Sequence, residues 1–332
     1  MTPFAYAAPC SRDEAVGLLA TPGARVLAGG TDLLALMRRG VEAPSLLVSL
    51  RRVPELDQIR AGADGGLVLG AAATLSQLAA APQVARQYPL LLEALEQLAT
   101  PQIRNAATVG GNLCQRPRCH YLRHPAFACT RSGGQGCPAR SGQNRYHAIF
   151  GAHGCAAVHP SDLAPALVAL EAVALAAGPR GERCLSLADF FAGPERDPRR
   201  ETVLATGELL AAVHLPPAPA GARGTFLKVT ERRAADFALV SLAAVVAGAG
   251  PRPSHVRLVL GGVAPVPWRL QRAEETVLEA GLTDEAIRRA AELAVDGACA
   301  LSQNAYKVRL ATALVRRALD QLRRADCPLP PH

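Results

Sequence analysis

The pattern of apolar and polar positions predicts short strands and helices in alternation near the start of the chain. Residues 13–20 have the apolar spacing of a helix, and residues 25–28 form a short apolar run typical of a strand. Two glycines end that run, and Thr31-Asp32 then offers an N-cap for a helix over 33–39. The pattern therefore predicts a strand, a glycine turn and a capped helix.

The same pattern continues through the middle of the chain and changes near its end. Further elements are predicted as strands in 45–59 and 66–70, a helix capped by Thr74, a helix over 90–98, and a helix capped by Ser161-Asp162 that runs through Leu170. Residues 216–224 are rich in Pro, Gly and Ala and form the best linker candidate. Beyond them we predict a buried strand or apolar helix at 240–247, a strand, turn and strand in 256–270, and helices over 283–298 and 305–324. The C-terminal third is therefore expected to be a separate α+β domain.

One stretch, Cys114 to Cys155, has neither the apolar spacing of a helix nor that of a strand. Glycine, proline and polar residues fill it, so a long irregular loop is expected, and such loops inside a compact domain are usually functional or disordered. It holds five of the nine cysteines, and clustered thiols favour a bound group that orders the loop. No Asp or Glu occurs from Gln97 through Ser161, whereas seven arginines do: Arg104, Arg116, Arg118, Arg123, Arg131, Arg140 and Arg145.

Composition and charge narrow the classes of function. The 332 residues suffice for two or three domains, and aromatic residues make up only 4%, which argues against a surface that stacks nucleic-acid bases. The net charge of +8 comes mostly from scattered arginines, with no basic block of the kind that binds DNA. No signal peptide and no apolar segment of about 18 residues is present, so we expect no membrane span. Clustered cysteines in odd number indicate a reducing, cytoplasmic location.

Two Gly-Gly pairs are candidate anion sites. Gly29-Gly30 lies between the predicted strand and helix, where free backbone N–H groups can face a phosphate and missing Cβ atoms let it approach. Gly110-Gly111 follows Thr108 and precedes Asn112, and we expect a strand to lead into it. An ordinary strand-to-helix turn is the alternative for either pair alone. The two pairs together are a more specific signal.

The cysteine spacing alone leaves three alternatives open. No Cys-x-x-Cys occurs, so the spacings of zinc ribbons and ferredoxins are absent. The cysteines could be unligated, could form a zinc site with histidines of the loop, or could hold an iron–sulfur cluster. A cluster with four thiolates is net negative, so arginines without competing carboxylates favour this last alternative.

Three motifs resemble the flavin-binding subunit of the molybdenum hydroxylases, the family of xanthine dehydrogenase, carbon monoxide dehydrogenase and aldehyde oxidoreductases. They are AGGTDLL at 28–34, IRNAATVGGNL at 103–113 and HPSDLAPAL at 159–167. The segments FLKVTERRAADFALVSLAAVV and NAYKVRLATALVRRAL resemble that subunit's C-terminal domain. The resemblance therefore covers essentially the whole chain.

The resemblance implies an α+β fold with a two-subdomain FAD-binding unit and a C-terminal α+β domain. The implied division is 1–55 for the first subdomain, 56–215 for the second, with its loop insertion at 114–155, and 222–326 for the C-terminal domain. It also implies an FAD site, with the pyrophosphate on the amides of Ala28 to Thr31 and Lys228 at the flavin; a solvated strand position is the alternative for Lys228. The implied FAD-binding residues are Leu27, Ala28, Gly29, Gly30, Thr31, Asp32, Leu33, Arg104, Thr108, Gly110, Gly111, Asn112, Ser161, Asp162, Leu163 and Lys228.

The loop resembles a branch of the family that carries an additional [4Fe-4S] cluster. Carried over position by position, the implied ligands are Cys119, Cys129, Cys137 and Cys155, with Cys114 as a spare or alternative ligand. His120 follows the first ligand where relatives most often have Trp or Pro, which leaves open whether an imidazole tunes the cluster.

The family works as a heterotrimer, so the resemblance implies two partners. Electrons would pass from a molybdenum cofactor on a large partner, through [2Fe-2S] clusters on a small partner, to FAD on this chain and then to an external acceptor. No catalytic acid or base is expected here. A stand-alone FAD oxidase of a small alcohol or amine and a zinc-binding scaffold without enzyme activity are the alternatives. Aldehydes are the first expected substrate and purines the second, and export with a signal-bearing partner is the alternative to a cytoplasmic location.

Overall fold

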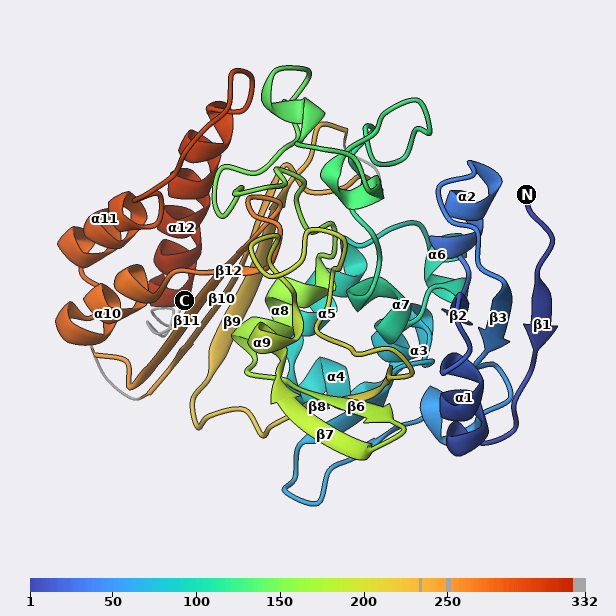
Figure 1. Cartoon of the computed structure of the whole chain (residues 1–332). Helices are drawn as coiled ribbons and strands as arrows, with labels where there is room; N and C mark the ends of the chain where they lie inside the picture. Colours follow the sequence, from blue (N-terminus) through green and yellow to red (C-terminus); the bar gives the residue numbers. More distant parts are fainter. Residues whose placement is uncertain (233–234, 249–251, 325–332) are drawn as a thin grey trace.

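The computed structural model of the chain describes residues 1–232, 235–248 and 252–324, and these form three β-sheets with helices around them (Figure 1). The sheets follow one another along the sequence. Their strands lie within residues 5–49, 59–215 and 223–269. A mixed helix and sheet fold, as predicted, is therefore confirmed.

The first sheet is small and parallel. In spatial order its strands are β1 (Ala5–Ala7), β3 (Leu46–Ser49) and β2 (Ala24–Leu27). Parallel neighbours need crossover connections, which here contain α1 (Arg12–Leu19) and α2 (Leu33–Arg38). The turn between β2 and α2 carries the first Gly-Gly pair.

The second sheet is antiparallel and has five strands. In spatial order they are β4 (Ile59–Ala61), β5 (Leu67–Gly70), β8 (Leu209–Leu215), β6 (Val173–Gly178) and β7 (Gly181–Ser186). The 3₁₀ turn η1 (Pro54–Asp57) precedes it, and its helices are α3 (Leu75–Ala80), α4 (Pro82–Gln87), α5 (Pro89–Glu96), α6 (Pro101–Ala106), α7 (Val109–Leu113), α8 (Leu163–Ala169) and α9 (Leu187–Phe190). The predicted Thr74 cap is confirmed, because its side chain accepts the N–H of Gln77.

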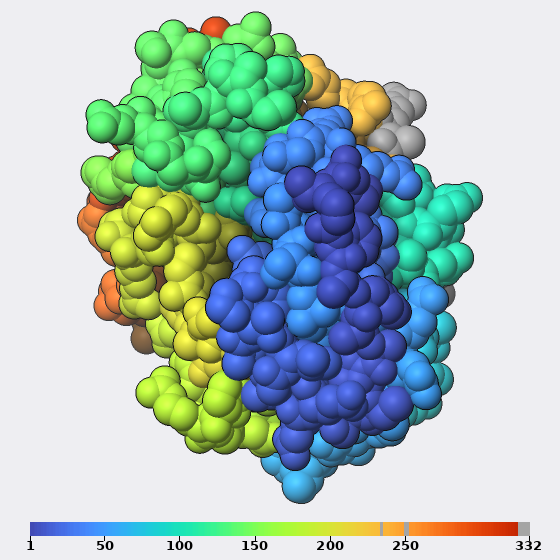
Figure 2. All heavy atoms as spheres, turned by 45° about the vertical axis from the view of Figure 1, so that its right-hand side comes forward, coloured from blue at the N-terminus to red at the C-terminus, as the bar shows by residue number. Residues whose placement is uncertain are grey.

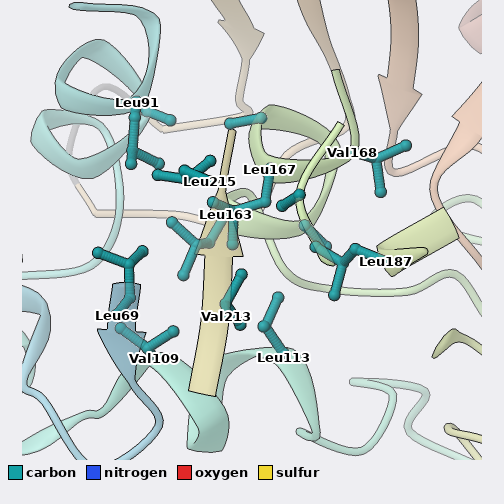
Figure 3. Packing of buried hydrophobic residues seen from close by; sticks show 14 of the residues in the cluster. Leu69, Leu91, Val109, Leu113, Leu163, Leu167, Val168, Leu187, Val213 and Leu215 are labelled. Atoms are coloured by element: carbon teal, nitrogen blue, oxygen red, sulfur yellow. The ribbon is translucent and has the colours of Figure 1, made fainter. Parts of the chain in front are cut away.

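Helix α8 lies at the centre of the largest apolar core. It is buried along its whole length, and Figure 3 shows Leu163 and Leu167 among side chains from β5, β8 and α7. A helix that is apolar all round must be covered on every side. The start of α8, which follows the His159-Pro160-Ser161-Asp162 turn, is thereby held in a fixed place.

The third sheet is antiparallel and is covered by the C-terminal helices (Figure 1). In spatial order its strands are β12 (Trp268–Arg269), β11 (His255–Gly261), β10 (Val240–Ala247) and β9 (Arg223–Val229). The helices are α10 (Gln271–Ala280), α11 (Asp284–Leu293) and α12 (Tyr306–Arg324).

Strand β10 is buried on both faces. Leu242 and Val246 belong to the core under the C-terminal helices, whereas Ala243 and Val245 belong to the core around α8. A strand covered on both sides is a continuous apolar run, which explains why periodicity left strand and helix open at 240–247.

The loop from 114 to 155 is irregular, as predicted, and forms one end of the molecule (green in Figure 2). All its residues are described, and they contain no strand and no helix beyond the 3₁₀ turns η2 (Thr130–Ser132) and η3 (Pro138–Arg140). Two asparagines tie the loop to the turn before α12. Asn144 Nδ2 donates to Ser302 Oγ at 3.0 Å, and Asn304 Nδ2 donates to the carbonyls of His147 and Ala148 at 3.0 and 3.1 Å.

Several predicted element bounds were wrong. The strand expected in 45–59 is shorter, since β3 ends at Ser49 and a 3₁₀ turn follows before β4. The helix expected over 283–298 ends at Leu293, and the sequence analysis missed α10. Helix α10 is amphipathic and buries Ala273, Glu274 and Val277, and its carboxylate at Glu274 pairs with Arg269.

Candidate functional site

The first Gly-Gly pair forms the turn between β2 and α2 and packs against the second. Gly30 has φ +71°, a conformation that glycine adopts without strain. A Cβ on Gly29 would lie 1.9 Å from the carbonyl oxygen of Ala106, which belongs to the motif at 103–113. The absence of this Cβ therefore lets the two motifs approach each other.

The second Gly-Gly pair lies in a helix, and the strand expected before it is wrong. Helix α6 precedes it, and Thr108 is the N-cap of α7, with its Oγ1 accepting the N–H of Gly111 at 3.1 Å. The helix is favoured over a strand because this bond satisfies a backbone N–H donor that the end of a strand would leave free. Thr108 still forms an isolated β-bridge with Thr74.

A cavity of about 690 Å³, here called the glycine cavity, is lined by both motifs. Predicted site residues in its wall are Ala28, Gly29, Gly30, Thr31, Asp32, Leu33, Thr108, Gly110 and Gly111. A Cβ on Gly111 would meet only Thr108 Oγ1 within 4 Å, so this side of α7 is open. Backbone-rich walls at a glycine turn suit a phosphate group.

Asp32 occupies the predicted N-cap position of α2, but its side chain does not cap the helix. It accepts instead from the Arg116 backbone N–H at 2.9 Å and from the Arg123 guanidinium at 2.6 Å, and it forms an ion pair with Arg118 at 3.2 Å. Charge-assisted contacts with two guanidinium groups outweigh a cap bond. Asp32 thus tethers the Cys114–Cys155 loop to the first sheet.

A second cavity, of about 340 Å³ and here called the polar cavity, lies between the loop and the third sheet. It is lined by Ser161 and Asp162 from the predicted site and by Arg118, Tyr146, Phe237 and Gly262 among others. The Nε of Arg118 is buried and has no partner among the described residues. Burial lowers the pKa of Arg118 to about 10, although Asp32 lies beside it. A buried donor without a partner suits a polar ligand.

Ser161 and Asp162 have different roles at the start of α8. Ser161 Oγ accepts the N–H of Ala164 at 2.9 Å and donates to Asn112 Oδ1 at 2.5 Å, so it caps the helix and contacts the second motif. Asp162 makes no cap bond, contrary to prediction, and pairs with Lys228 Nζ at 2.8 Å. Burial raises the pKa of Asp162 in spite of the lysine.

Lys228 is not the solvated strand residue that was its alternative. Its side chain is 3% exposed, and its Nζ also donates to the carbonyl of Gln97 at 2.8 Å. Some of the predicted FAD-binding residues lie outside both cavities. Among the described residues that line the glycine and polar cavities, we do not find Leu27, Arg104, Asn112, Leu163 or Lys228. Arg104 donates to the carbonyls of Leu98 and Ala99.

Cys119, Cys129, Cys137 and Cys155 line one small cavity, here called the thiol cavity, of about 10 Å³. A hydrogen bond between the Cys155 and Cys137 thiols lowers the pKa of Cys137 and raises that of Cys155. Burial raises the pKa of Cys119, to which nearby Cys129 and Cys155 contribute. Within the described part of the chain, no three ligating side chains are close enough to hold a single ion.

Cys114 lies apart from these four. It lines the glycine cavity, and burial raises its pKa to about 12, with Glu201 adding to the effect.

His147 contacts the thiol cluster; the sequence offered it, with His120 and His124, only as a ligand in the zinc alternative. Its Nε2 lies 3.3 Å from Cys119 Sγ, and its Nδ1 is buried with no partner in the described structure. Burial lowers the pKa of His147 to about 4, so the ring is neutral at pH 7.

The loop arginines are not free of carboxylates, which corrects the electrostatic argument from sequence. The carboxylates come from distant segments: Arg116 pairs with Glu42 and Glu201, Arg131 with Glu201 at 2.8 Å, and Arg145 with Glu231 at 2.9 Å. No local signal in the sequence marks Glu42 or Glu201, because each lies dozens of residues away from the loop arginine that it contacts.

Comparison with known families identifies the class. Residues 2–218 match the model of the FAD-binding domain in molybdopterin dehydrogenase, and residues 225–322 match the C-terminal domain of the carbon monoxide dehydrogenase flavoprotein. The chain therefore belongs to this family and is the FAD subunit of a molybdenum hydroxylase of the aldehyde oxidoreductase, carbon monoxide dehydrogenase and xanthine dehydrogenase type.

Individual relatives agree with this class. The aldehyde oxidoreductase FAD-binding subunit of Escherichia coli (strain K12) is 42% identical over 265 residues, which is 79% of this chain and 81% of the relative. The carbon monoxide dehydrogenase medium chain of Hydrogenophaga pseudoflava is 30% identical and covers 96% of both chains. A solved carbon monoxide dehydrogenase from that organism has a TM-score of 0.78 at 29% identity, covering 99% of this chain and 100% of its own.

No helix among the described residues is both long and apolar enough to cross a bilayer.

Proposed function

We propose that this chain is the FAD- and [4Fe-4S]-carrying electron-transfer subunit of an aldehyde-oxidising molybdenum hydroxylase. The observation that carries the proposal is the thiol cavity, in which four cysteines from an otherwise irregular loop converge. Aldehydes are favoured over purines because the relative at 42% identity is named an aldehyde oxidoreductase.

The residues of the glycine cavity fit the phosphate part of FAD. Ala28 to Thr31 would hold the pyrophosphate from one side, and Thr108, Gly110 and Gly111 would hold it from the other. The open side of Gly111 and the missing Cβ atoms support this assignment. FAD, when bound, supplies the change between two-electron and one-electron transfer.

The polar cavity fits the other end of an extended cofactor. Asp162 lines this cavity and is fixed by its buried pair with Lys228, and the unpartnered Nε of Arg118 offers a donor. Ser161 lines the polar cavity and donates to Asn112, which directly follows Gly111 of the glycine cavity. These residues bind and orient; none has to exchange a proton in a chemical step.

The four thiols fit a [4Fe-4S] cluster better than a single ion. The described residues that line the thiol cavity offer four cysteines and no histidine or carboxylate, which is the ligand set that a [4Fe-4S] cluster would take. Cluster binding would replace the Cys137–Cys155 hydrogen bond and separate the thiols, because the cavity between them is small. The proposal takes no ligand from Cys114, which lines the glycine cavity and not the thiol cavity.

The proposal includes two partners: a large molybdenum-cofactor subunit and a small [2Fe-2S] subunit in a heterotrimer. The division at 1–55, 56–215 and 222–326 is part of it and is supported by the separate sheets. A cytoplasmic location, or export with a signal-bearing partner, stays a prediction.

Metal and flavin analysis of the purified full-length protein tests the proposal. We expect flavin absorption with a broad iron–sulfur shoulder and about four irons per chain. Flavin without iron would reject the cluster and leave the FAD site standing. A colourless protein with one zinc would contradict both. Full aldehyde oxidation by this chain alone, without molybdenum, would contradict the electron-transfer role.

A further inference from the structure

Arg131 lines both the glycine cavity and the thiol cavity. Its side chain is 2% exposed, so its charge is shielded from water and ions. The residue belongs to η2, directly after Cys129 and Thr130, and this position directs the guanidinium between the two sites. Few charged side chains are buried so fully without a specific partner on each side.

Each end of the Arg131 guanidinium has a partner in a different site. Its Nε donates to Cys155 Sγ at 3.1 Å, and its Nη1 donates to Glu201 Oε1 at 2.8 Å. Cys155 lines the thiol cavity, and Glu201 lines the glycine cavity. The guanidinium therefore forms a direct charge contact between a proposed cluster ligand and the wall of the flavin site.

Glu201 limits the positive charge that reaches Cys155. The same carboxylate oxygen also accepts from Arg116 Nε at 3.3 Å, and Arg116 pairs in turn with Glu42. Two arginines thus face two carboxylates, and the net field at the thiol depends on both signs. Removing the charge of Arg131 should make the field at the thiol more negative, and removing the charge of Glu201 should make it more positive.

We propose that Arg131 is a positioning residue that stabilises negative charge on Cys155 and so raises the reduction potential of the centre held by the four cysteines, with Glu201 as the counter-charge that limits this effect. The inference depends on the proposed [4Fe-4S] function. The reduced form of such a centre carries one more negative charge than the oxidised form. A buried positive group bonded to a ligand sulfur therefore favours reduction.

The test is an EPR-monitored redox titration of the complete complex, with iron and flavin counted in each variant. Arg131→Gln should lower the reduction potential of the cluster, and Glu201→Gln should raise it. We expect about a tenfold change in the reduction equilibrium constant in each case, which is about 59 mV for one electron. Arg140→Gln is the matched control, since this loop arginine is exposed and donates to the carbonyl of Ala152.

Opposite signs separate an electrostatic role from a structural one, because damage to the fold would move both variants alike. Unchanged potentials in iron-loaded Arg131→Gln and Glu201→Gln would overturn the inference and leave the cluster in place. If Arg131→Gln loses its iron, Arg131→Lys and Glu201→Gln provide the test. Arg131→Lys keeps the positive charge and should stay near the wild-type reduction potential. A wild-type reduction potential in Glu201→Gln would overturn the inference. Wild-type protein without iron would reject the proposed function itself, and the inference with it.

Discussion

The glycine cavity and the thiol cavity share a wall but are built in different ways. The two glycine motifs of the glycine cavity are a short turn and a short capped helix shaped by near neighbours, as in the bond from Gly111 N–H to Thr108 Oγ1. The thiol cavity comes from an irregular loop whose cysteines are held by contacts from distant segments. Asp32, Glu201 and Asn304 provide such contacts from outside the loop.

This difference predicts which substitutions should disrupt each site. A turn stabilised by its own residues fails when its backbone geometry is disturbed. A loop stabilised from outside fails when a ligand or a distant anchor is removed. Substitutions in the two regions should therefore affect different cofactors, and the buried ion pair behind α8 should affect the whole chain.

The largest expected effect is the loss of iron in Cys155→Ser. The thiolate is both a proposed ligand and the partner of Arg131, so its removal leaves three ligands and an unpaired guanidinium. Iron should fall from about four per chain to near zero, while most of the flavin stays bound. Cys184→Ser, at an exposed position on β7, should keep both cofactors. Equal loss of flavin and iron in Cys155→Ser would show that the flavin site and the cluster site depend on each other.

Asp162→Asn should destabilise the fold strongly. It leaves the ammonium of Lys228 buried without a counter-charge, and breaking a buried pair costs about 3–5 kcal/mol. Urea unfolding of the full chain measures this loss. The exposed i,i+4 pair gives the comparison, since Asp236→Asn opposite Arg232 should leave stability nearly unchanged. Similar losses in both variants would contradict the burial argument.

Gly29→Ala should cost about 1–3 kcal/mol and release flavin, because its new Cβ would collide with the backbone of Ala106. Iron should be retained better than flavin, which is the reverse of the Cys155→Ser result. Gly17→Ala in α1 is the matched control. Nothing lies within 4 Å of its Cβ position, so this change should stabilise the helix by about 1 kcal/mol. An unchanged flavin content in Gly29→Ala would refute the close-approach role.

The smallest effect concerns Lys307, which holds the far end of the loop. Its Nζ donates to the carbonyls of Tyr146 and Gly262, and burial lowers its pKa from 10.5 to about 7. Between these pH values the unfolded chain binds a proton that the folded chain lacks, so stability rises with pH there; below pH 7 the penalty is fully present. The free energy of unfolding of wild type, relative to that of Lys307→Met, should rise by about 1 kcal/mol per pH unit from pH 7 to 9. Parallel pH profiles would count against this.

The sequence was sufficient for the family, the sheet-and-helix class and the first glycine turn, because these depend on local patterns, whereas the second Gly-Gly pair lies in helix α7 and does not follow a strand. It also identified the four cysteines that come together, through a resemblance rather than through their spacing. It failed for Asp32 and Asp162, which were expected to cap helices and instead bind guanidinium and ammonium groups brought from far along the chain. It also missed Glu201 and considered His147 only as a zinc ligand, because the partners of both residues are set by the folded loop.

Strand β10 has a consequence for how the molecule melts. Its odd and even residues belong to two different cores, one beneath the C-terminal helices and one around α8. Neither core can lose its order without exposing one face of the same strand to water. The C-terminal domain and the flavin-binding part should therefore unfold as one cooperative unit, in a single calorimetric transition, although separate family models describe them.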